Sequence, residues 1–169
     1  MRVVVFDVDG VLNLPGDFFS KFYADKRQID PAPIESFFKN EWQSVVSGQK
    51  DLWEAVQEHN DAWQWDGTKQ ELISMWGDSE NNSDHELVEI VQTLRANGTL
   101  CYIATNQEKY RGSYIKDVMY PGKFDGYFVS GEMGVCKPEK EFYEQITTEV
   151  SRELAGLTPS DIVFYDDTQ

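Results

Sequence analysis

The chain has 169 residues, the size of one domain with room for a small insertion, which excludes a large multidomain protein. Hydrophobic residues make up 40% and aromatic residues 14% of the sequence, enough to offset the entropy cost of ordering the backbone, so a wholly disordered chain is excluded. The 15 basic and 30 acidic residues give a net charge of −15, which repels nucleic acids and anionic membranes, and we expect neither as a partner.

The first predicted element is a strand at residues 3–6, a short apolar run without polar alternation. Three similar runs follow at residues 100–104, 127–129 and 162–165. Continuous runs rich in β-branched and aromatic residues are typical of strands that are buried on both faces, as in a parallel sheet between helices. The runs therefore predict an α/β protein with a Rossmann-like parallel sheet.

Residues 14–82 interrupt the alternation of strands and helices, because a single crossover needs far fewer residues. All five tryptophans lie in this segment, and apolar residues recur at helical spacing after Ile34, Leu52 and Leu72. We interpret the tryptophans as core residues of the segment rather than as ligands. The sequence predicts a small all-α cap at residues 14–82, inserted into a Rossmann-like core formed by residues 1–13 and 83–169.

Two helices are predicted between the strands of the core. Ser83 and Glu86 have the spacing of a capping box, and Asn97-Gly98 is a typical helix end. A second helix is predicted to begin near Pro138, which suits a first helical turn. It carries four apolar residues on one side: Phe142, Ile146, Val150 and Leu154. This alternation of elements implies right-handed crossovers and a ligand site beyond the carboxyl ends of the strands.

The two cysteines, Cys101 and Cys136, are too few for a disulfide framework, and no Cys/His spacing is typical of a zinc site. The N-terminal segment reaches Asp7 before a long apolar stretch forms, and no later run approaches the length of a membrane span. We therefore expect a cytoplasmic protein without a signal peptide or membrane anchor.

Chemically useful side chains follow the predicted strands. Asp7-Val8-Asp9-Gly10 follows the first strand, Thr105-Asn106 the second and Asp166-Asp167 the fourth, while the loop after the third reaches Lys137. The ends of parallel strands lie at one edge of a sheet, so we expect these side chains to converge. Two carboxylates about 4 Å apart repel by roughly 4 kcal/mol at an effective dielectric constant near 20. Such a cluster needs a proton or a cation, and hard oxygen ligands favour Mg²⁺.

These four segments resemble the motifs of the haloacid dehalogenase (HAD) superfamily. Asp7-Val8-Asp9-Gly10-Val11 resembles the first motif, Ala104-Thr105-Asn106 the second, Cys136-Lys137-Pro138 the third and Phe164-Tyr165-Asp166-Asp167 the fourth. The first motif alone is a weak signal, whereas four motifs in order at strand ends are a strong one. The nearest likeness is to the phosphatase branch with a helical cap between the first two motifs.

The resemblance implies catalytic roles for four residues. Asp7 would attack a phosphoryl group to give an aspartyl-phosphate, and Asp9 would protonate the leaving oxygen and later accept a proton from water. Alternation of side chains along a strand would place both carboxylates on one face. Thr105 and Lys137 would stabilise the transition state. The second acid, Asp9, favours phosphate chemistry over carbon–halogen cleavage, because the dehalogenase branch lacks it.

Substrate and metal ligands are implied in the same way. Gly10 and the backbone N–H of Asn106 would help to bind the substrate. The residues that would hold Mg²⁺ are Asp7, Asp9 through its backbone carbonyl, Asp167, and Asp166 as a more distant or alternative ligand. The function implied is a Mg²⁺-dependent phosphomonoester hydrolase acting on a small phosphorylated metabolite.

Members of this superfamily usually continue with a further helix and strand after the fourth motif. The sequence ends at Gln169, so we expect these two elements to be missing, as in a truncated product, and residues 162–165 to form an exposed apolar edge that offers a route to self-association. Two alternatives stay open: a catalytically weak or inactive phosphate- or protein-binding module of the same fold, and a phosphotransferase that moves phosphate between sugar positions.

Overall fold

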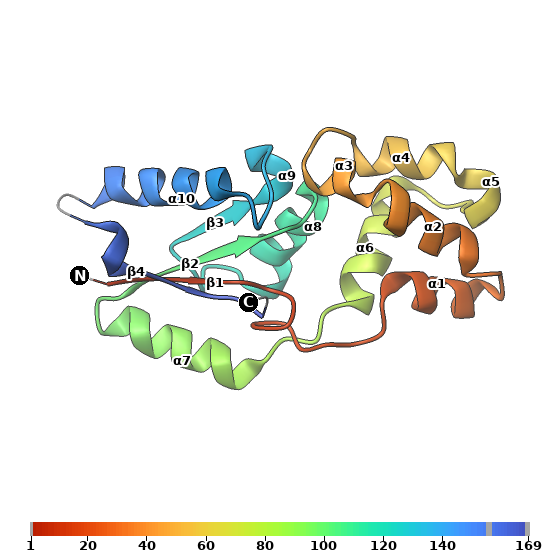
Figure 1. Ribbon diagram of the computed structural model, residues 1–169. Helices are drawn as coiled ribbons and strands as arrows, with labels where there is room; N and C mark the ends of the chain where they lie inside the picture. Colours follow the sequence, from red (N-terminus) through yellow and green to blue (C-terminus); the bar gives the residue numbers. More distant parts are fainter. Residues whose placement is uncertain (1, 155–156, 168–169) are drawn as a thin grey trace.

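The computed structural model describes residues 2–154 and 157–167 of the chain. Within this part the strands form one parallel sheet in the order β3-β2-β1-β4 (Figure 1). The strands are β1 (Val3–Phe6), β2 (Leu100–Thr105), β3 (Gly126–Val129) and β4 (Ile162–Tyr165). The predicted parallel sheet is confirmed, with every strand boundary within one residue of its prediction.

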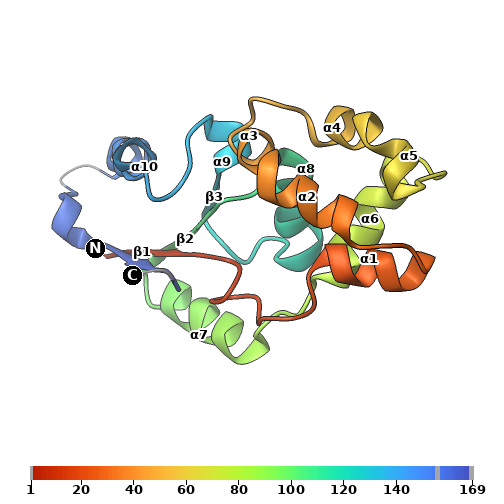
Figure 2. The same ribbon diagram turned by 45° about the vertical axis from the view of Figure 1, so that its right-hand side comes forward.

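Helices cover both faces of this sheet, as predicted (Figures 1 and 2). Helix α7 (His85–Ala96) packs on one face and α10 (Lys140–Glu153) on the other. Because side chains alternate along a strand, Val4 and Phe6 join the apolar cluster of α7, whereas Val3 and Val5 join that of α10. The remaining elements of the core are α8 (Lys109–Tyr114), the π-helical turn η1 (Ile115–Met119), α9 (Ser130–Met133) and the short η2 (Pro159–Asp161).

Strand β4 lies at an edge of the sheet and pairs with β1. Val163 is 43% and Tyr165 is 55% exposed, so the prediction that every strand is buried on both faces is wrong for β4; residues 126–128 of β3, at the other edge, are only half-buried. An edge strand has a neighbour on one side only, which leaves part of its surface to solvent. The exposed apolar edge expected at residues 162–165 is present, and self-association through it stays a prediction.

Residues 14–82, all of them described, form a helical insertion between β1 and α7, seen at the right of Figure 1. Its helices are α1 (Phe19–Arg27), α2 (Ala32–Asn40), α3 (Trp42–Val46), α4 (Leu52–Glu58), α5 (Asn60–Trp63) and α6 (Lys69–Ser79). The insertion has its own apolar core, in which Trp63 is completely buried and Trp65 and Trp76 are 7% exposed. Their burial agrees with the interpretation of the tryptophans as core residues.

Two expected helix starts need correction. The residue that caps α7 is Asp84, whose carboxylate accepts a hydrogen bond from the Leu87 N–H at 3.0 Å, whereas the Ser83 hydroxyl lies near Asn81 and Tyr120. Pro138 lies outside the first turn of α10, because a backbone hydrogen bond from Glu139 to Cys136 forms a turn there. Phe142, like Ile146 and Val150, is completely buried, so the predicted apolar side of α10 is confirmed.

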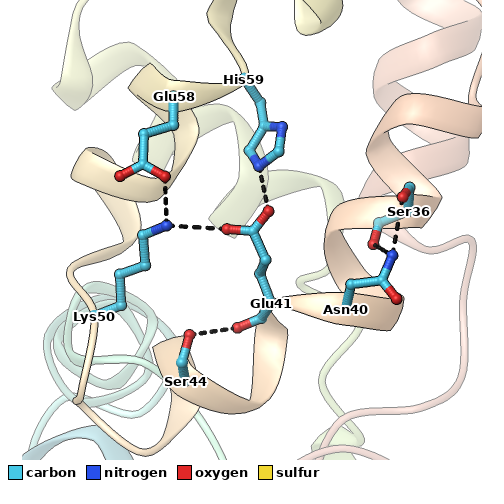
Figure 3. A network of polar contacts seen from close by, with 7 residues as sticks. All are labelled: Ser36, Asn40, Glu41, Ser44, Lys50, Glu58 and His59. Atoms are coloured by element: carbon cyan, nitrogen blue, oxygen red, sulfur yellow. Dashed lines mark hydrogen bonds and ion pairs between the residues drawn. The ribbon is translucent and has the colours of Figure 1, made fainter.

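A polar network joins helices within the insertion (Figure 3). Glu41, at the junction of α2 and α3, contacts His59 and forms an ion pair with Lys50 at 3.0 Å. Lys50 also pairs with Glu58 of α4 at 2.6 Å. Hydrogen bonding from Lys50 holds the pKa of Glu41 below its ordinary value. The network is accessible to solvent, so it orients these helices and adds little to stability.

Buried polar contacts fasten the insertion to the core. The Arg111 guanidinium of α8 donates hydrogen bonds to the carbonyls of Gly77 and Glu80, at 2.9 and 3.1 Å, where α6 ends. A cation at that end of a helix is favoured by the helix dipole. The Ser130 hydroxyl of α9 donates to the Val46 carbonyl at 2.6 Å. No helix in the described part of the chain is long and apolar enough to cross a membrane.

Glu108 makes stability depend on pH in a predictable direction. It caps α8 by accepting hydrogen bonds from the Tyr110 and Arg111 N–H groups, and burial raises its pKa to about 7. A raised carboxyl pKa means that its contribution to stability is full below pH 4.5 and is lost as the pH rises towards 7.

Glu108→Gln keeps an accepting oxygen and removes the titration. As the pH rises from 4.5 to 8, we expect the native chain to lose up to about 3 kcal/mol of unfolding free energy relative to the Glu108→Gln variant, because position 108 does not titrate in the variant. Urea unfolding at a series of pH values measures the difference. A pH-independent difference between the two proteins would contradict the assignment.

Candidate active site

A cavity of about 720 Å³ opens beside the carboxyl ends of the strands. Seven of the residues singled out from the sequence line it: Asp7, Asp9, Gly10, Thr105, Asn106, Lys137 and Asp167. Asp166 lies against Lys137 at the same place. The fold therefore brings all the predicted site residues together, although they come from four separate segments of the chain. The two linkers to the insertion also contribute to the wall, through residues 13–18 and residues 79, 80 and 82.

Lys137 lies between two carboxylates. Its ammonium is 2.6 Å from Asp7 Oδ2 and 2.7 Å from Asp166 Oδ2, and the Lys137 and Asp7 side chains are only 9% and 10% exposed. Burial raises the pKa of Asp7, although Lys137 opposes this shift. Burial alone would lower the pKa of Lys137, but the two carboxylates outweigh it and raise that pKa. Lys137 therefore stays protonated, and its two ion pairs fix the ammonium beside Asp7.

Three carboxylates at this place could hold a metal ion. Asp7, Asp166 and Asp167 each offer an oxygen, and these oxygens lie within 4.8 Å of one another. Their summed charge exceeds that of the single ammonium by two, and all the donors are hard oxygens. A divalent cation such as Mg²⁺ fits both the charge and the donor type.

The carboxylate of Asp9 is held by two amides. Asn13 donates to Oδ1 at 3.0 Å and Gln107 donates to Oδ2 at 2.5 Å. Strand β1 ends at Phe6, so Asp7 and Asp9 lie in the following loop, and the expectation that strand alternation aligns them is wrong. The backbone of the loop and the hydrogen bonds from these two amides set the position of Asp9 instead. Neither amide was singled out from the sequence, although Gln107 directly follows the second motif.

The end of β2 supplies Thr105 and Asn106. Thr105 is 1% exposed and reaches the cavity. The Asn106 side chain donates to the Lys137 carbonyl at 2.9 Å and accepts from the Lys137 N–H at 2.8 Å. It therefore fixes the backbone that carries the lysine, a role that the sequence did not indicate because it depends on a contact 31 residues away.

Gly10 leaves the space in which Asp167 lies. Its φ of +79° is in the left-handed region, and a Cβ placed on it would lie 2.5 Å from Asp167 Oδ2. A side chain at position 10 would therefore be strained and would displace the aspartate.

Gly10→Ala is expected to weaken Mg²⁺ binding by at least about tenfold, because a displaced ligand commonly costs this much or more. Gly98→Ala is the matched control: its φ is +83°, so it carries the same backbone strain, but no atom lies within 4 Å of the added Cβ. Calorimetric titration with MgCl₂ compares the two. Equal losses in both variants would mean that strain, and not Asp167, is responsible.

A family model described as haloacid dehalogenase-like hydrolase matches residues 1–169. The chain belongs to this family. The resemblance seen in the four motifs is thereby confirmed, and with it the assignment of the protein as a hydrolase. Comparison with curated proteins finds no significant match.

Solved structures support the same fold. A HAD family enzyme from Bacteroides thetaiotaomicron, crystallised with magnesium and inorganic phosphate, has a TM-score of 0.79 at 17% identity, covering 100% of this chain and 86% of the other. A predicted HAD-like hydrolase from Porphyromonas gingivalis has a TM-score of 0.74 at 20% identity, covering 97% and 80%. An L-2-haloacid dehalogenase has a TM-score of 0.58 at 18% identity, covering 97% and 77%. At these identities the likeness shows the fold alone.

Proposed function

We propose that this HAD-like hydrolase is a Mg²⁺-dependent phosphomonoesterase that acts on a small phosphorylated metabolite through an aspartyl-phosphate. One observation carries the proposal: a buried carboxylate, Asp7, lies against the Lys137 ammonium in a cavity that a second acid, Asp9, also lines. A nucleophile, an acid and a fixed positive charge are the groups that transfer of a phosphoryl group to a carboxylate requires.

In the first step, a carboxylate oxygen of Asp7 forms a bond to phosphorus while the bond from phosphorus to the leaving oxygen breaks. Protonated Asp9 gives its proton to that leaving oxygen, so the product departs as a neutral alcohol. Lys137 stabilises the charge on the transferring group. Thr105 holds a phosphoryl oxygen through its hydroxyl, and Asn106 holds another through its backbone N–H.

In the second step, water attacks the phosphorus of the aspartyl-phosphate. Asp9, now ionised, takes a proton from this water, and the bond between phosphorus and Asp7 breaks. Inorganic phosphate is released and both aspartates return to their starting state. Asp7, the Asp9 carbonyl, Asp167 and Asp166 are the residues that would hold Mg²⁺, which supplies positive charge that neutralises the phosphoryl oxygens.

The same family includes dehalogenases, and Asp9 is the residue that favours phosphate chemistry. An alkoxide is a poor leaving group and gains from a proton donor, whereas a halide leaves without one. Asp9 lines the cavity and both of its carboxylate oxygens accept hydrogen bonds from amides, which supports the proposal of an acid at this position.

We further propose that the helical insertion acts as a cap. The segments that connect it to the core run side by side, with hydrogen bonds from the Leu14 N–H to Asn82 and from the Asp84 N–H to Leu12 at 2.9 and 2.8 Å. Both segments contribute to the cavity wall. A movement of the insertion about these linkers would open or close the cavity around a substrate.

The test is turnover of p-nitrophenyl phosphate with MgCl₂ and with EDTA. We expect release of inorganic phosphate that depends on the metal. Activity toward 2-chloropropionate without activity toward any phosphate ester would favour a dehalogenase. Calorimetric binding of phosphate without turnover would favour a binding module, and an isomeric sugar phosphate in place of free phosphate would indicate a phosphotransferase.

A further inference from the structure

The carboxylate of Asp9 has both oxygens occupied by side-chain amides from different parts of the chain. Asn13 Nδ2 lies 3.0 Å from Oδ1, and Gln107 Nε2 lies 2.5 Å from Oδ2. Asp9 itself is exposed and lies in a loop, where a carboxylate with a single partner would rotate among several rotamers. Two donors, one at each oxygen, fix both its direction and the plane of the group.

The two amides are themselves held in place. Asn13 is 5% exposed, donates a second hydrogen bond to the Glu80 carbonyl at 2.9 Å and accepts one from the Asn82 N–H at 2.8 Å. This pattern defines which atom of the amide is nitrogen and points it at Asp9. The donor therefore cannot turn away without losing three hydrogen bonds.

Gln107 is anchored through its backbone. Its carbonyl accepts a hydrogen bond from the Gly131 N–H at 3.0 Å, and Gln107 is only 8% exposed. Asp9 lines the cavity and Gln107 does not, among the residues that the structure describes, so the contact of Gln107 with the site is the hydrogen bond to Asp9.

We infer that Gln107 and Asn13 are positioning residues that hold Asp9 for proton transfer to the leaving group, an inference that rests on the proposed phosphatase function. Amides suit this task because they donate hydrogen bonds and do not ionise near neutral pH, so they orient Asp9 without competing for its proton. Misplacement of a reacting group by about 1 Å can cost about 100-fold in rate, so the loss of one donor should be measurable.

The test compares two substrates with different needs for a proton. Glycerol 2-phosphate releases an alkoxide and depends on Asp9, whereas p-nitrophenyl phosphate releases a stable phenolate. The ratio kcat/KM is measured because it covers the steps up to departure of the leaving group and excludes hydrolysis of the aspartyl-phosphate. For Gln107→Leu we expect kcat/KM to fall by about 10- to 100-fold with glycerol 2-phosphate and by less than about threefold with p-nitrophenyl phosphate.

Asn13→Ala tests the same inference at a second position, with the same difference between substrates, so a folding defect in one variant leaves the other informative. Gln92→Leu is the control: this amide of α7 donates to the Lys123 carbonyl at 2.8 Å, away from the cavity, and we expect neither substrate to change. Equal losses with both substrates, or no loss with glycerol 2-phosphate, would overturn the inference while leaving the phosphatase in place. If the native chain turned over neither substrate, the proposed function would be overturned as well.

Discussion

Replacing Asp7 with asparagine is expected to lower turnover of p-nitrophenyl phosphate by roughly 10⁴-fold or more, because the attacking carboxylate is lost. The protein should remain folded. Burial raises the pKa of Asp7, so its ionised form is costly in the folded state, and Asp166 still neutralises Lys137 in the variant. We expect the free energy of unfolding to stay within about 1 kcal/mol of the native value.

Steady-state kinetics and urea unfolding of the same preparation measure both quantities. Asp125→Asn is the matched control for turnover, since Asp125 pairs with Arg95 at 2.8 Å and accepts a hydrogen bond from the Cys101 N–H at 2.8 Å, away from the cavity. Turnover by Asp7→Asn within tenfold of the native rate would show that Asp7 is not the nucleophile.

Replacing Lys137 with methionine is expected to have the largest effect on stability. The substitution keeps an unbranched side chain, one atom shorter, and leaves Asp7 and Asp166 without the ammonium that lies 2.6 and 2.7 Å from them. Removing one partner of a buried ion pair costs about 3–5 kcal/mol, because the remaining charge is buried and uncompensated. Loss of transition-state stabilisation should lower kcat by about 100- to 1000-fold as well.

Urea unfolding with EDTA and with MgCl₂ tests whether the loss of stability comes from the uncompensated charge of the two carboxylates. Because a divalent cation neutralises the same carboxylates, Mg²⁺ should restore part of the stability of Lys137→Met and have a smaller effect on the native chain. Lys140→Met removes a lysine that pairs with Glu144 and is 88% exposed, and it should change stability little. Equal stability of the two variants would contradict the role assigned to Lys137.

The sheet could be predicted from the sequence because its signal is local. Residues 3–6 and 162–165 are continuous apolar runs with polar residues at both ends, and the ends of the runs define β1 and β4. Parallel pairing then carries Asp7, Thr105 and Asp167 to one edge without any further information. The position of the candidate site follows from this topology.

The contacts that hold the site could not be predicted, because they join segments far apart in the sequence. Gln107 and Asp9 are 98 residues apart, and Asn106 and Lys137 are 31 apart, and neither pair leaves a spacing pattern in the chain. No sequence pattern singles out helix α1, although Phe19, Tyr23 and Ala24 are buried and Phe22 packs partly buried against the same apolar cluster. The start of α7 was misplaced by one residue because Ser83 and Asp84 are both good capping residues.

Mass spectrometry of the enzyme quenched in acid during turnover of a phosphomonoester tests whether Asp7 is the nucleophile. Attack by Asp7 predicts a phosphoryl group on the peptide that contains Asp7, present with MgCl₂, and absent with EDTA and in Asp7→Asn. A phosphoryl group on another residue, or active enzyme that never carries one, would contradict attack by Asp7.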